Sequence, residues 1–449
     1  MTLDLRRVAT DLVERARSAG ASAADAVAFE SDSLEVGVRL RETEKLRRAR
    51  ERAVGLRVFV GQSTAIVSTA DFAATALDAL AHDAVNLARA TAPDEHGGLP
   101  DPNDLARDVP DLALYDDALE RFEVADALAL ARTAEEAALS ASAEITNSEG
   151  AECGGGGGQV AYASSLGFSG TYARSSFSLV MVPIASRDGQ MQRDHWYSAH
   201  RTLAGLDAAA DVGREAARRT LRRLGARQVP TQECPIVFDP QAAASLLGHL
   251  ASAISGSSLY RRASFLLDKL GEPIASPAIT ILDDPLAIGG LASRPFDGEG
   301  VASQRRTIVE KGVLQSYLLD SYSARRLGMR STGHAIRGAG DAPGVSPTNF
   351  FLTPGPHTPE EIIGSVRSGL YVTELIGFGV NGVTGDYSRG AAGLWIENGE
   401  LTTAVEEVTI AGNLLDMFKR ISMVGVDLRF RTAVAAPTIK IDQMMLAGA

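Results

Sequence analysis

A single histidine, His249, stands in a helical pattern over residues 238–256 that looks like a metal-binding helix without its ligands. The catalytic helix of a zinc peptidase carries two histidines about one turn apart, with a glutamate beside the first that activates water. In this chain Leu250 follows His249, where that glutamate would stand. Ala253 and Ile254 occupy the positions from which a second histidine could share the face. Any catalysis therefore has to come from elsewhere in the chain or from a partner.

The other histidines of interest do not form a ligand cluster. His195 and His200 are five residues apart, a spacing that does not define one ligand face. His334 lies in a polar, glycine-bearing loop over residues 331–335, where it is either a functional residue or one that orders the loop. The sequence has no GxSxG nucleophile elbow, and its acidic pairs lack EF-hand spacing. Neither a Ser/His/Asp hydrolase nor a calcium site is therefore supported.

Three further patterns are interpreted as structural. The glycine run over residues 154–158 lacks the spacing of a phosphate loop and predicts a flexible surface loop between strands. The basic run over residues 47–52 has no interleaved aromatic residues and predicts a solvated strand or hairpin face. Cations near the C-terminal end of a helix complement its dipole. That role is expected for Arg218, Arg219, Arg222, Arg223 and Arg227.

Composition bounds the class of protein. The chain has 449 residues, 45% apolar and 22% charged, which is typical of a globular protein with two domains. Its net charge of −12 argues against nucleic acid as a partner, because phosphate binding needs a basic surface. Cys153 and Cys234 lack CxxC partners and predict free thiols in a reducing compartment. Without an apolar signal segment or a long apolar run, we expect a soluble cytoplasmic protein with no membrane partner.

Residues 1–229 alternate helical and strand patterns and predict an α+β layer domain. A polar, proline-bearing link over residues 225–232 is the predicted domain boundary. Gly61-Gln62 predicts a hairpin turn. Helices are expected at residues 3–19, 73–90, 122–142 and 207–224, and strands at residues 26–30, 34–40, 55–60 and 64–68.

Residues 230–449 predict a second, mainly antiparallel β domain with few helices and a barrel-like or curled sheet, because turns become frequent there. Lys311-Gly312 and Asn398-Gly399 predict hairpin turns, since these pairs allow positive φ. Strands are expected at residues 279–282, 306–310, 313–319, 370–378, 393–397, 401–410 and 438–446.

Several segments of this second half keep a recognisable order. The most specific reads VTGDYSRGAAG over residues 383–393 and is followed by WIENGE over residues 395–400. Together these segments resemble the TldD/PmbA family of modulator-of-gyrase-type peptidases, and specifically its PmbA (TldE) branch. The other matching segments are residues 248–256, 260–268, 295–300, 322–328, 331–334, 410–414 and 437–442, with residues 55–60 and 68–71 as less distinctive points in the first half.

The resemblance implies a zinc site in the catalytic TldD branch, built from a HExxxH helix and a downstream cysteine. In this chain the corresponding regions, residues 248–252 and 428–437, hold neither the ligands nor a cysteine. The chain is thus expected to bind no cofactor, with zinc in a TldD-like catalytic subunit that pairs with it as a heterodimer. Alone it is expected to form a homodimer. It is expected to assist proteolysis of unfolded or leader peptides.

Six residues are expected to bind substrate or partner, and none is expected to be catalytic or to bind metal: His249, His334, Gly385, Asp386, Tyr387 and Arg389. The alternative is that residues 383–393 form a tight structural turn with an internal Asp386–Arg389 pair. Two other functions stay open. One is a self-sufficient peptidase with a site around His195, His200 or His334, and the other is a peptide-binding regulatory module.

Overall fold

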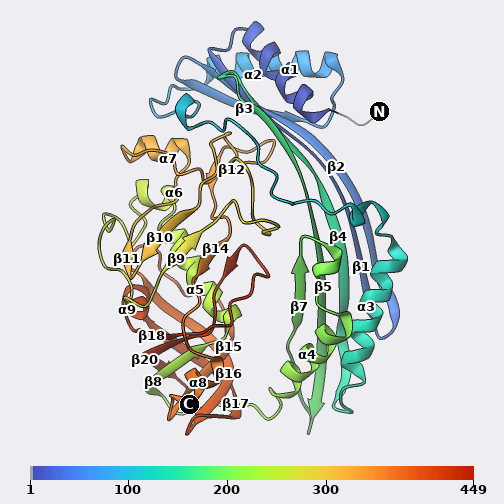
Figure 1. Cartoon of the computed structure of the whole chain (residues 1–449), viewed down its shortest axis with the longest axis vertical. Helices are drawn as coiled ribbons and strands as arrows, with labels where there is room; N and C mark the ends of the chain where they lie inside the picture. The colour runs from blue at the N-terminus through green and yellow to red at the C-terminus, as the bar shows by residue number, and fades with distance from the viewer. Residues whose placement is uncertain (1–3, 449) are drawn as a thin grey trace.

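The structure is a computed structural model that describes residues 4–448, and its N-terminal half is built on one long, curved antiparallel sheet (Figure 1). The strand order is β3-β2-β1-β4-β5-β6, with β7 also paired to β5. The four central strands have 17 to 20 residues each, so each spans more than about 50 Å. The strands are β1 (Ala23–Arg39), β2 (Glu42–Val60), β3 (Ser63–Thr69), β4 (Ile145–Ser164), β5 (Ser169–Arg187), β6 (Gln190–Arg193) and β7 (Trp196–His200).

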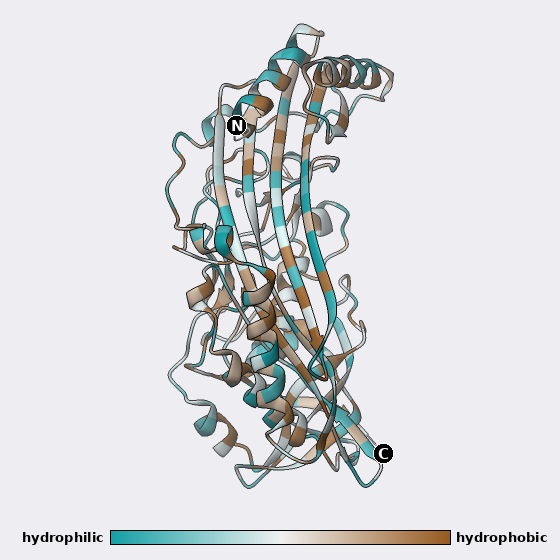
Figure 2. Ribbon diagram, turned by 90° about the vertical axis from the view of Figure 1, so that its right-hand side faces the viewer, coloured by the Kyte–Doolittle hydropathy of each residue, from teal (hydrophilic) through white to brown (hydrophobic). Residues whose placement is uncertain are grey.

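Four helices cover this sheet in two apolar clusters. Helices α1 (Leu5–Ser18) and α2 (Ala74–Ala90) pack on one end of the sheet, and α3 (Val124–Leu139) and α4 (Ala209–Leu221) pack near the other. Most of the buried helix residues are alanines, whose small side chains let a helix lie close to the strands. Figure 2 shows apolar and polar segments alternating along the long strands. These features confirm the predicted α+β fold.

The glycine run is a correction to the sequence interpretation. Residues 154–158 lie in the middle of β4, hydrogen-bonded to both β1 and β5, and do not form a flexible surface loop. A Cβ atom on Gly158 would lie 1.8 Å from the carbonyl oxygen of Glu30, and one on Gly157 would lie 2.4 Å from that of Arg174. The run is therefore glycine because neighbouring backbones approach it closely. The basic run, by contrast, lies on β2 with its arginines largely exposed, as predicted.

The C-terminal half contains a barrel. Strands β17-β16-β15-β8-β20-β18 form one sheet, and an additional β17–β20 pairing closes its first five strands. All neighbours in this sheet are antiparallel except β8 and β15, which confirms the mainly antiparallel prediction. The strands are β8 (Gln232–Phe238), β15 (Ser368–Ile376), β16 (Asp386–Glu397), β17 (Glu400–Asn413), β18 (Ile421–Val424) and β20 (Ile439–Ala447).

A smaller sheet of order β11-β10-β9-β14-β19 packs beside the barrel, together with the pair β12–β13. The predicted turns at Lys311-Gly312 and Asn398-Gly399 are present with positive φ, as is the turn at Gly61-Gln62. The strand predicted over residues 313–319 was too long. These strands are β9 (Ile281–Asp283), β10 (Arg306–Glu310), β11 (Val313–Leu314), β12 (Ala335–Ile336), β13 (Gly344–Val345), β14 (Phe350–Leu352) and β19 (Val434–Ala435).

Helix α5 (Pro240–Ala253) is the main helix of this half and contacts β8, β14, β15 and β19. Its start follows from sequence, because the Asp239 side chain accepts a hydrogen bond from the Ala242 N–H at 2.8 Å and Pro240 occupies the first turn. The remaining helices are short: α6 (Gly256–Tyr260), α7 (Ser321–Arg326), α8 (Pro359–Gly364) and α9 (Leu414–Lys419). None of the helices in residues 4–448 is both long and apolar enough to cross a membrane.

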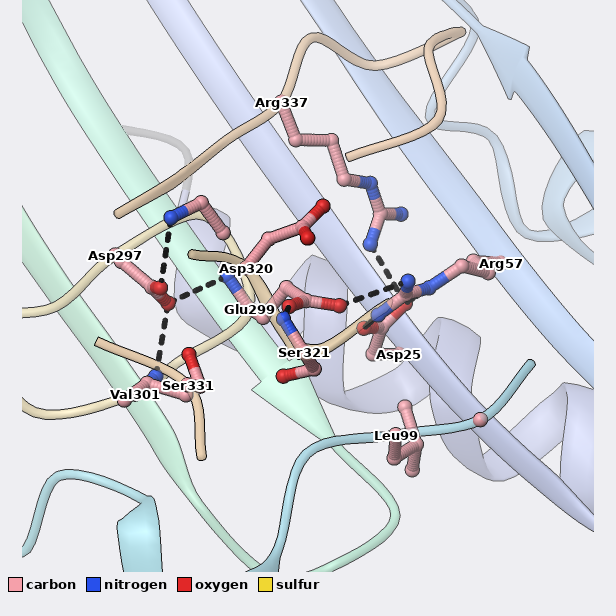
Figure 3. Close-up of polar contacts among 12 residues, drawn as sticks. Asp25, Arg57, Leu99, Asp297, Glu299, Val301, Asp320, Ser321, Ser331 and Arg337 are labelled. Atoms are coloured by element: carbon pink, nitrogen blue, oxygen red, sulfur yellow. Dashed lines mark hydrogen bonds and ion pairs between the residues drawn. The ribbon is translucent and has the colours of Figure 1, made fainter. Parts of the chain in front are cut away.

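A buried charge network joins the two halves (Figure 3). Arg57 of β2 bonds Asp25 of β1 at 2.5 and 3.1 Å and reaches Glu299 of the second half at 3.0 Å. Arg337 adds a bond to Asp25 at 2.6 Å, and the Tyr162 hydroxyl donates another at 3.0 Å. Burial would raise the pKa of Asp25, but Arg337 and Arg57 outweigh it and hold that pKa at about 2. The predicted division at residues 229 and 230 into separate domains stays a prediction.

Candidate functional site

A cleft of about 670 Å³ lies where the N-terminal sheet meets the barrel. We call it the arginine cleft. Its walls come from β7, α4, the first turns of α5, β15, Arg389 of β16 and the segment over residues 427–436. In Figure 1, β7 borders the side of the long sheet that is nearest to the C-terminal half. Sequence reasoning gave no sign of this cleft, because its walls are some 200 residues apart in the chain.

One face of α5 presents polar side chains to this region. Gln241, Ser245 and His249 are spaced by four residues and therefore share a face. Within the described chain, Gln241 Nε2, Ser245 Oγ and His249 Nε2 are buried without a hydrogen-bond partner. Gln241 and Ser245 line the arginine cleft, and His249 lies one turn further along. Burial, with a smaller effect of Arg389, lowers the pKa of His249, so its imidazole is neutral at pH 7.

His249 meets two of the residues predicted from the 383–393 segment. Its ring stands edge-on to that of Tyr387, with centroids 6.1 Å apart and planes at 74°. The Tyr387 hydroxyl is buried without a partner among residues 4–448. Arg389 donates from Nη2 to the Leu375 carbonyl at 3.1 Å and lines the arginine cleft. The structure therefore brings His249, Tyr387 and Arg389 together, although their roles in binding stay a prediction.

Asp386 and Gly385 lie apart from that group. Successive strand residues point to opposite faces, so Asp386 points away from Tyr387 and Arg389. The Asp386 carboxylate accepts hydrogen bonds from Thr384 Oγ1 at 2.6 Å and Asn413 Nδ2 at 3.4 Å, so the Asp386–Arg389 pair considered above does not form. Gly385 has φ of 82°, which favours glycine at the entry to β16.

The cleft carries more cations than anions, with six arginines and four carboxylates among its lining residues. Arg219 bonds Asp239 at 3.2 Å, and both Arg219 and Arg431 lie over the ring of Trp196, at 5.0 and 4.6 Å. The α4 arginines were interpreted only as complements to the helix dipole. That was incomplete, because Arg218, Arg219 and Arg222 also line this wall. Their spacing of three and four along one helix was the available signal.

These side chains do not fit a zinc site. Zinc needs three or four nitrogen, sulfur or carboxylate ligands, whereas the α5 face supplies one imidazole, an amide and a hydroxyl. No group of three or more His, Cys, Asp or Glu within residues 4–448 is placed to hold a metal ion. Cys153 and Cys234 are buried in β4 and β8, where burial raises their thiol pKa values to about 12 and about 11.

The other predicted histidines occupy separate environments. His334 is buried, with Nε2 3.1 Å from Asp283 Oδ2 and Nδ1 2.8 Å from Thr332 Oγ1, an arrangement that orders its loop. His195 stacks on Tyr197 at the edge of the arginine cleft. His200 contacts Thr202 Oγ1 at 2.9 Å. The structure thus does not bring His195, His200 and His334 into one site.

Comparison with known proteins identifies the family. Models described as PmbA/TldA metallopeptidase domain 1, central domain and C-terminal domain match residues 24–88, 117–224 and 231–448. The metalloprotease PmbA of Escherichia coli O157:H7 is 39% identical over 425 residues, which cover 95% of this chain and 92% of that protein. This chain belongs to the PmbA/TldD family. The PmbA homolog of Haemophilus influenzae is 40% identical over 448 residues, 99% of this chain and 96% of that one.

The chain is also similar to a TldD homolog and to solved structures. The metalloprotease TldD homolog of Haemophilus influenzae is 28% identical over 252 residues, 52% of each chain. A crystal structure from Bacteroides thetaiotaomicron, whose name refers to modulation of DNA gyrase, superposes with a TM-score of 0.92 at 29% identity over both full chains. TldE of Thermococcus kodakarensis shares the fold, with a TM-score of 0.89 at 21% identity over 98% of this chain and 99% of that one. The PmbA/TldD chain described here therefore shares its fold with these solved structures over nearly its full length, and its helix α5 carries no zinc ligand set.

Proposed function

We propose that this chain is a subunit of a TldD-type metallopeptidase complex that carries no catalytic metal and helps to hold extended peptides for a zinc-bearing partner. The proposal rests on helix α5. The helix forms one wall of the arginine cleft, while its face beside the cleft offers one histidine and no carboxylate. A wall can keep its shape and its hydrogen-bond donors after losing its metal ligands. We propose that this wall of the cleft contacts the extended peptide.

The similarity between PmbA and TldD proteins supports a paired assembly. Related chains with one fold carry related surfaces, and such surfaces often assemble in pairs. The same reasoning supports a homodimer when the chain is alone. A self-sufficient peptidase receives no support from the separate positions of His195, His200 and His334. A peptide-binding regulatory module would use the same cleft but would need no peptidase partner. Measuring cleavage with and without a TldD-type partner therefore distinguishes that function from the proposed one.

We further propose that an apolar segment contacts the partner. The last residue of β15 and the loop that connects it to β16 expose three apolar side chains, with Phe378 fully exposed and Ile376 and Val383 each 55% exposed. Exposed apolar side chains that gather on one loop mark a contact surface. We propose that this segment contacts the TldD-type partner. Phe378→Ser should therefore weaken association by at least about tenfold, a typical effect for an aromatic residue at an interface centre. Leu87→Ser, at a half-exposed leucine on α2, is the matched control.

The test mixes the purified chain with a TldD-type protein that keeps its HExxxH helix. Size-exclusion chromatography with light scattering measures association, and cleavage of an unfolded peptide is followed by mass spectrometry. We expect co-elution, and cleavage that is much faster with both chains than with either alone. If the chains elute separately and cleavage by the partner is unchanged, the proposal is wrong. Peptide affinity in the isolated chain together with that result would favour the regulatory module.

A further inference from the structure

The arginine cleft concentrates hydrogen-bond donors that have no acceptor. Among residues 4–448, the buried atoms without a partner include Nε and Nη2 of Arg222, Nε of Arg389 and Nε2 of Gln241, and all three side chains line this one cleft. Ser245 Oγ beside them is also unpartnered. Buried polar groups in folded proteins are almost always hydrogen-bonded to protein, water or ligand. Because guanidinium groups only donate, a group rich in acceptor oxygens would complement these side chains.

The charges within the cleft indicate which acceptor fits. Each of its four carboxylates is already bound: Glu215 by Arg218 at 2.7 Å, Asp239 by Arg219 at 3.2 Å, Glu374 by Arg223, and Asp427 by the Thr438 hydroxyl at 2.7 Å. Arg222 and Arg429, in contrast, have no carboxylate within ion-pair distance in the described chain, and Arg429 is exposed at the rim. Burial, and then the like charge of Arg219, lowers the pKa of Arg222. An anion beside Arg222 would oppose this lowering of the pKa, because it stabilises the charged guanidinium.

Contacts within the chain also fix the positions of the side chains that line the cleft. Trp196 lies under the guanidinium groups of both Arg219 and Arg431, and Arg431 is fixed further by Asp207 at 2.8 Å. Its volume of about 670 Å³ is in the range of pockets that enclose a small ligand. A planar guanidinium matches a carboxylate with two parallel hydrogen bonds.

We propose that the arginine cleft binds a carboxylate group of an extended peptide, with Arg222 as its main ligand and Arg389 and Gln241 as further donors. The carboxylate is either the C-terminal group of the peptide or an acidic side chain. The peptide nature of the ligand rests on the proposed function. The test uses the isolated chain, so that its outcome does not depend on whether a TldD-type partner binds.

The assay uses tryptophan fluorescence. The chain has two tryptophans, and Trp395→Phe leaves Trp196, which lies in the cleft, as the only reporter. Four acetylated Gly/Ser/Ala peptides of equal length are titrated: a free acid, its C-terminal amide, the amide with a central Glu, and the amide with a central Gln. We expect the free acid or the Glu amide to bind at least about tenfold more tightly than its neutral counterpart. Which of the two binds identifies the source of the carboxylate.

Variants in the same background assign the effect to the cleft. Arg222→Met should remove the preference for the charged peptide, and Arg222→Lys should retain part of it. Arg214→Met, on the exposed face of the same helix where Arg214 pairs with Asp211, should leave it unchanged. If Arg222→Met does not fold by circular dichroism, Arg389→Met takes its place. Equal binding of all four peptides, or a preference that survives both substitutions, would overturn the proposal. Loss of co-elution with a TldD-type partner would overturn the proposed function and leave this result standing.

Discussion

Asp25→Asn tests whether the buried network in Figure 3 stabilises the joined halves. The Asp25 side chain is fully buried and accepts bonds from Arg57, Arg337 and Tyr162. Asparagine keeps the shape but leaves two buried guanidinium groups without their shared counter-charge. Breaking a buried ion pair by removing one partner costs about 3–5 kcal/mol. We expect the free energy of unfolding at pH 7 to fall by that amount.

The pH dependence gives an independent measure of the same contact. The pKa of Asp25 is about 2 in the folded chain and 3.8 in its ordinary state, a difference that corresponds to about 2 kcal/mol. Because the folded pKa is the lower one, this stabilisation is fully present above about pH 5 and is lost as the pH falls toward 2. Asp25→Asn lacks the titrating group. The difference in the free energy of unfolding between wild type and variant should therefore become smaller as the pH falls from about 5 toward 2.

The assay is urea unfolding followed by far-ultraviolet circular dichroism at pH 7, 5 and 3. Asp32→Asn is the matched control, because Asp32 lies on the same strand and faces Arg50 at 3.0 Å but is partly exposed. Exposed pairs contribute less than about 1 kcal/mol. A stabilising role of Asp25 is refuted if Asp25→Asn lowers the free energy of unfolding no more than Asp32→Asn does. It is also refuted if the difference in the free energy of unfolding between wild type and Asp25→Asn is the same at every pH.

Two further predictions concern particular positions. Gly158→Ala should destabilise the chain strongly or prevent folding, because its Cβ would lie 1.8 Å from the Glu30 carbonyl oxygen. Gly248→Ala on α5, in contrast, places its Cβ where no atom lies within 4 Å. This second substitution should stabilise the chain by about 0.5–1 kcal/mol. Thermal unfolding of the two variants checks both signs, and similar melting temperatures would contradict the account of the glycine run. His249→Ala should lower peptide cleavage by the mixed complex by less than about tenfold, because His249 is expected to bind substrate or partner and not metal. A loss of the order of 100-fold, typical of a lost catalytic group, would show that it takes part in the chemistry.

Local sequence signals predicted the parts of the fold that short-range physics decides. The helical pattern over residues 238–256 contains α5, and Asn398-Gly399 marked a hairpin, because helical periodicity and turns depend on neighbouring residues. The glycine run was misinterpreted because its strand conformation depends on β1 and β5, which pair with it on both sides. Composition carries no information about such partners.

The site shows the same limit. His249, Tyr387 and Arg389 were among the predicted residues, and the structure brings them together. The arginine cleft was not predicted, since Arg222 at the C-terminal end of α4 and Arg431 of the segment 427–436 line one cleft only after the two halves join. The Arg57–Glu299 bond in the buried network likewise spans 242 positions in sequence. Such contacts follow from the tertiary arrangement rather than from local pattern.

The most direct test of the central claim measures bound zinc and peptide cleavage on the same preparations. The isolated chain, the TldD-type partner and their complex are each analysed by mass spectrometry for metal content and assayed with an unfolded peptide, with and without a chelator. The account predicts about one zinc per complex, carried by the partner, no chelator-sensitive cleavage by the isolated chain, and full activity only in the complex. Stoichiometric zinc in the isolated chain together with chelator-sensitive cleavage by that chain alone would contradict it.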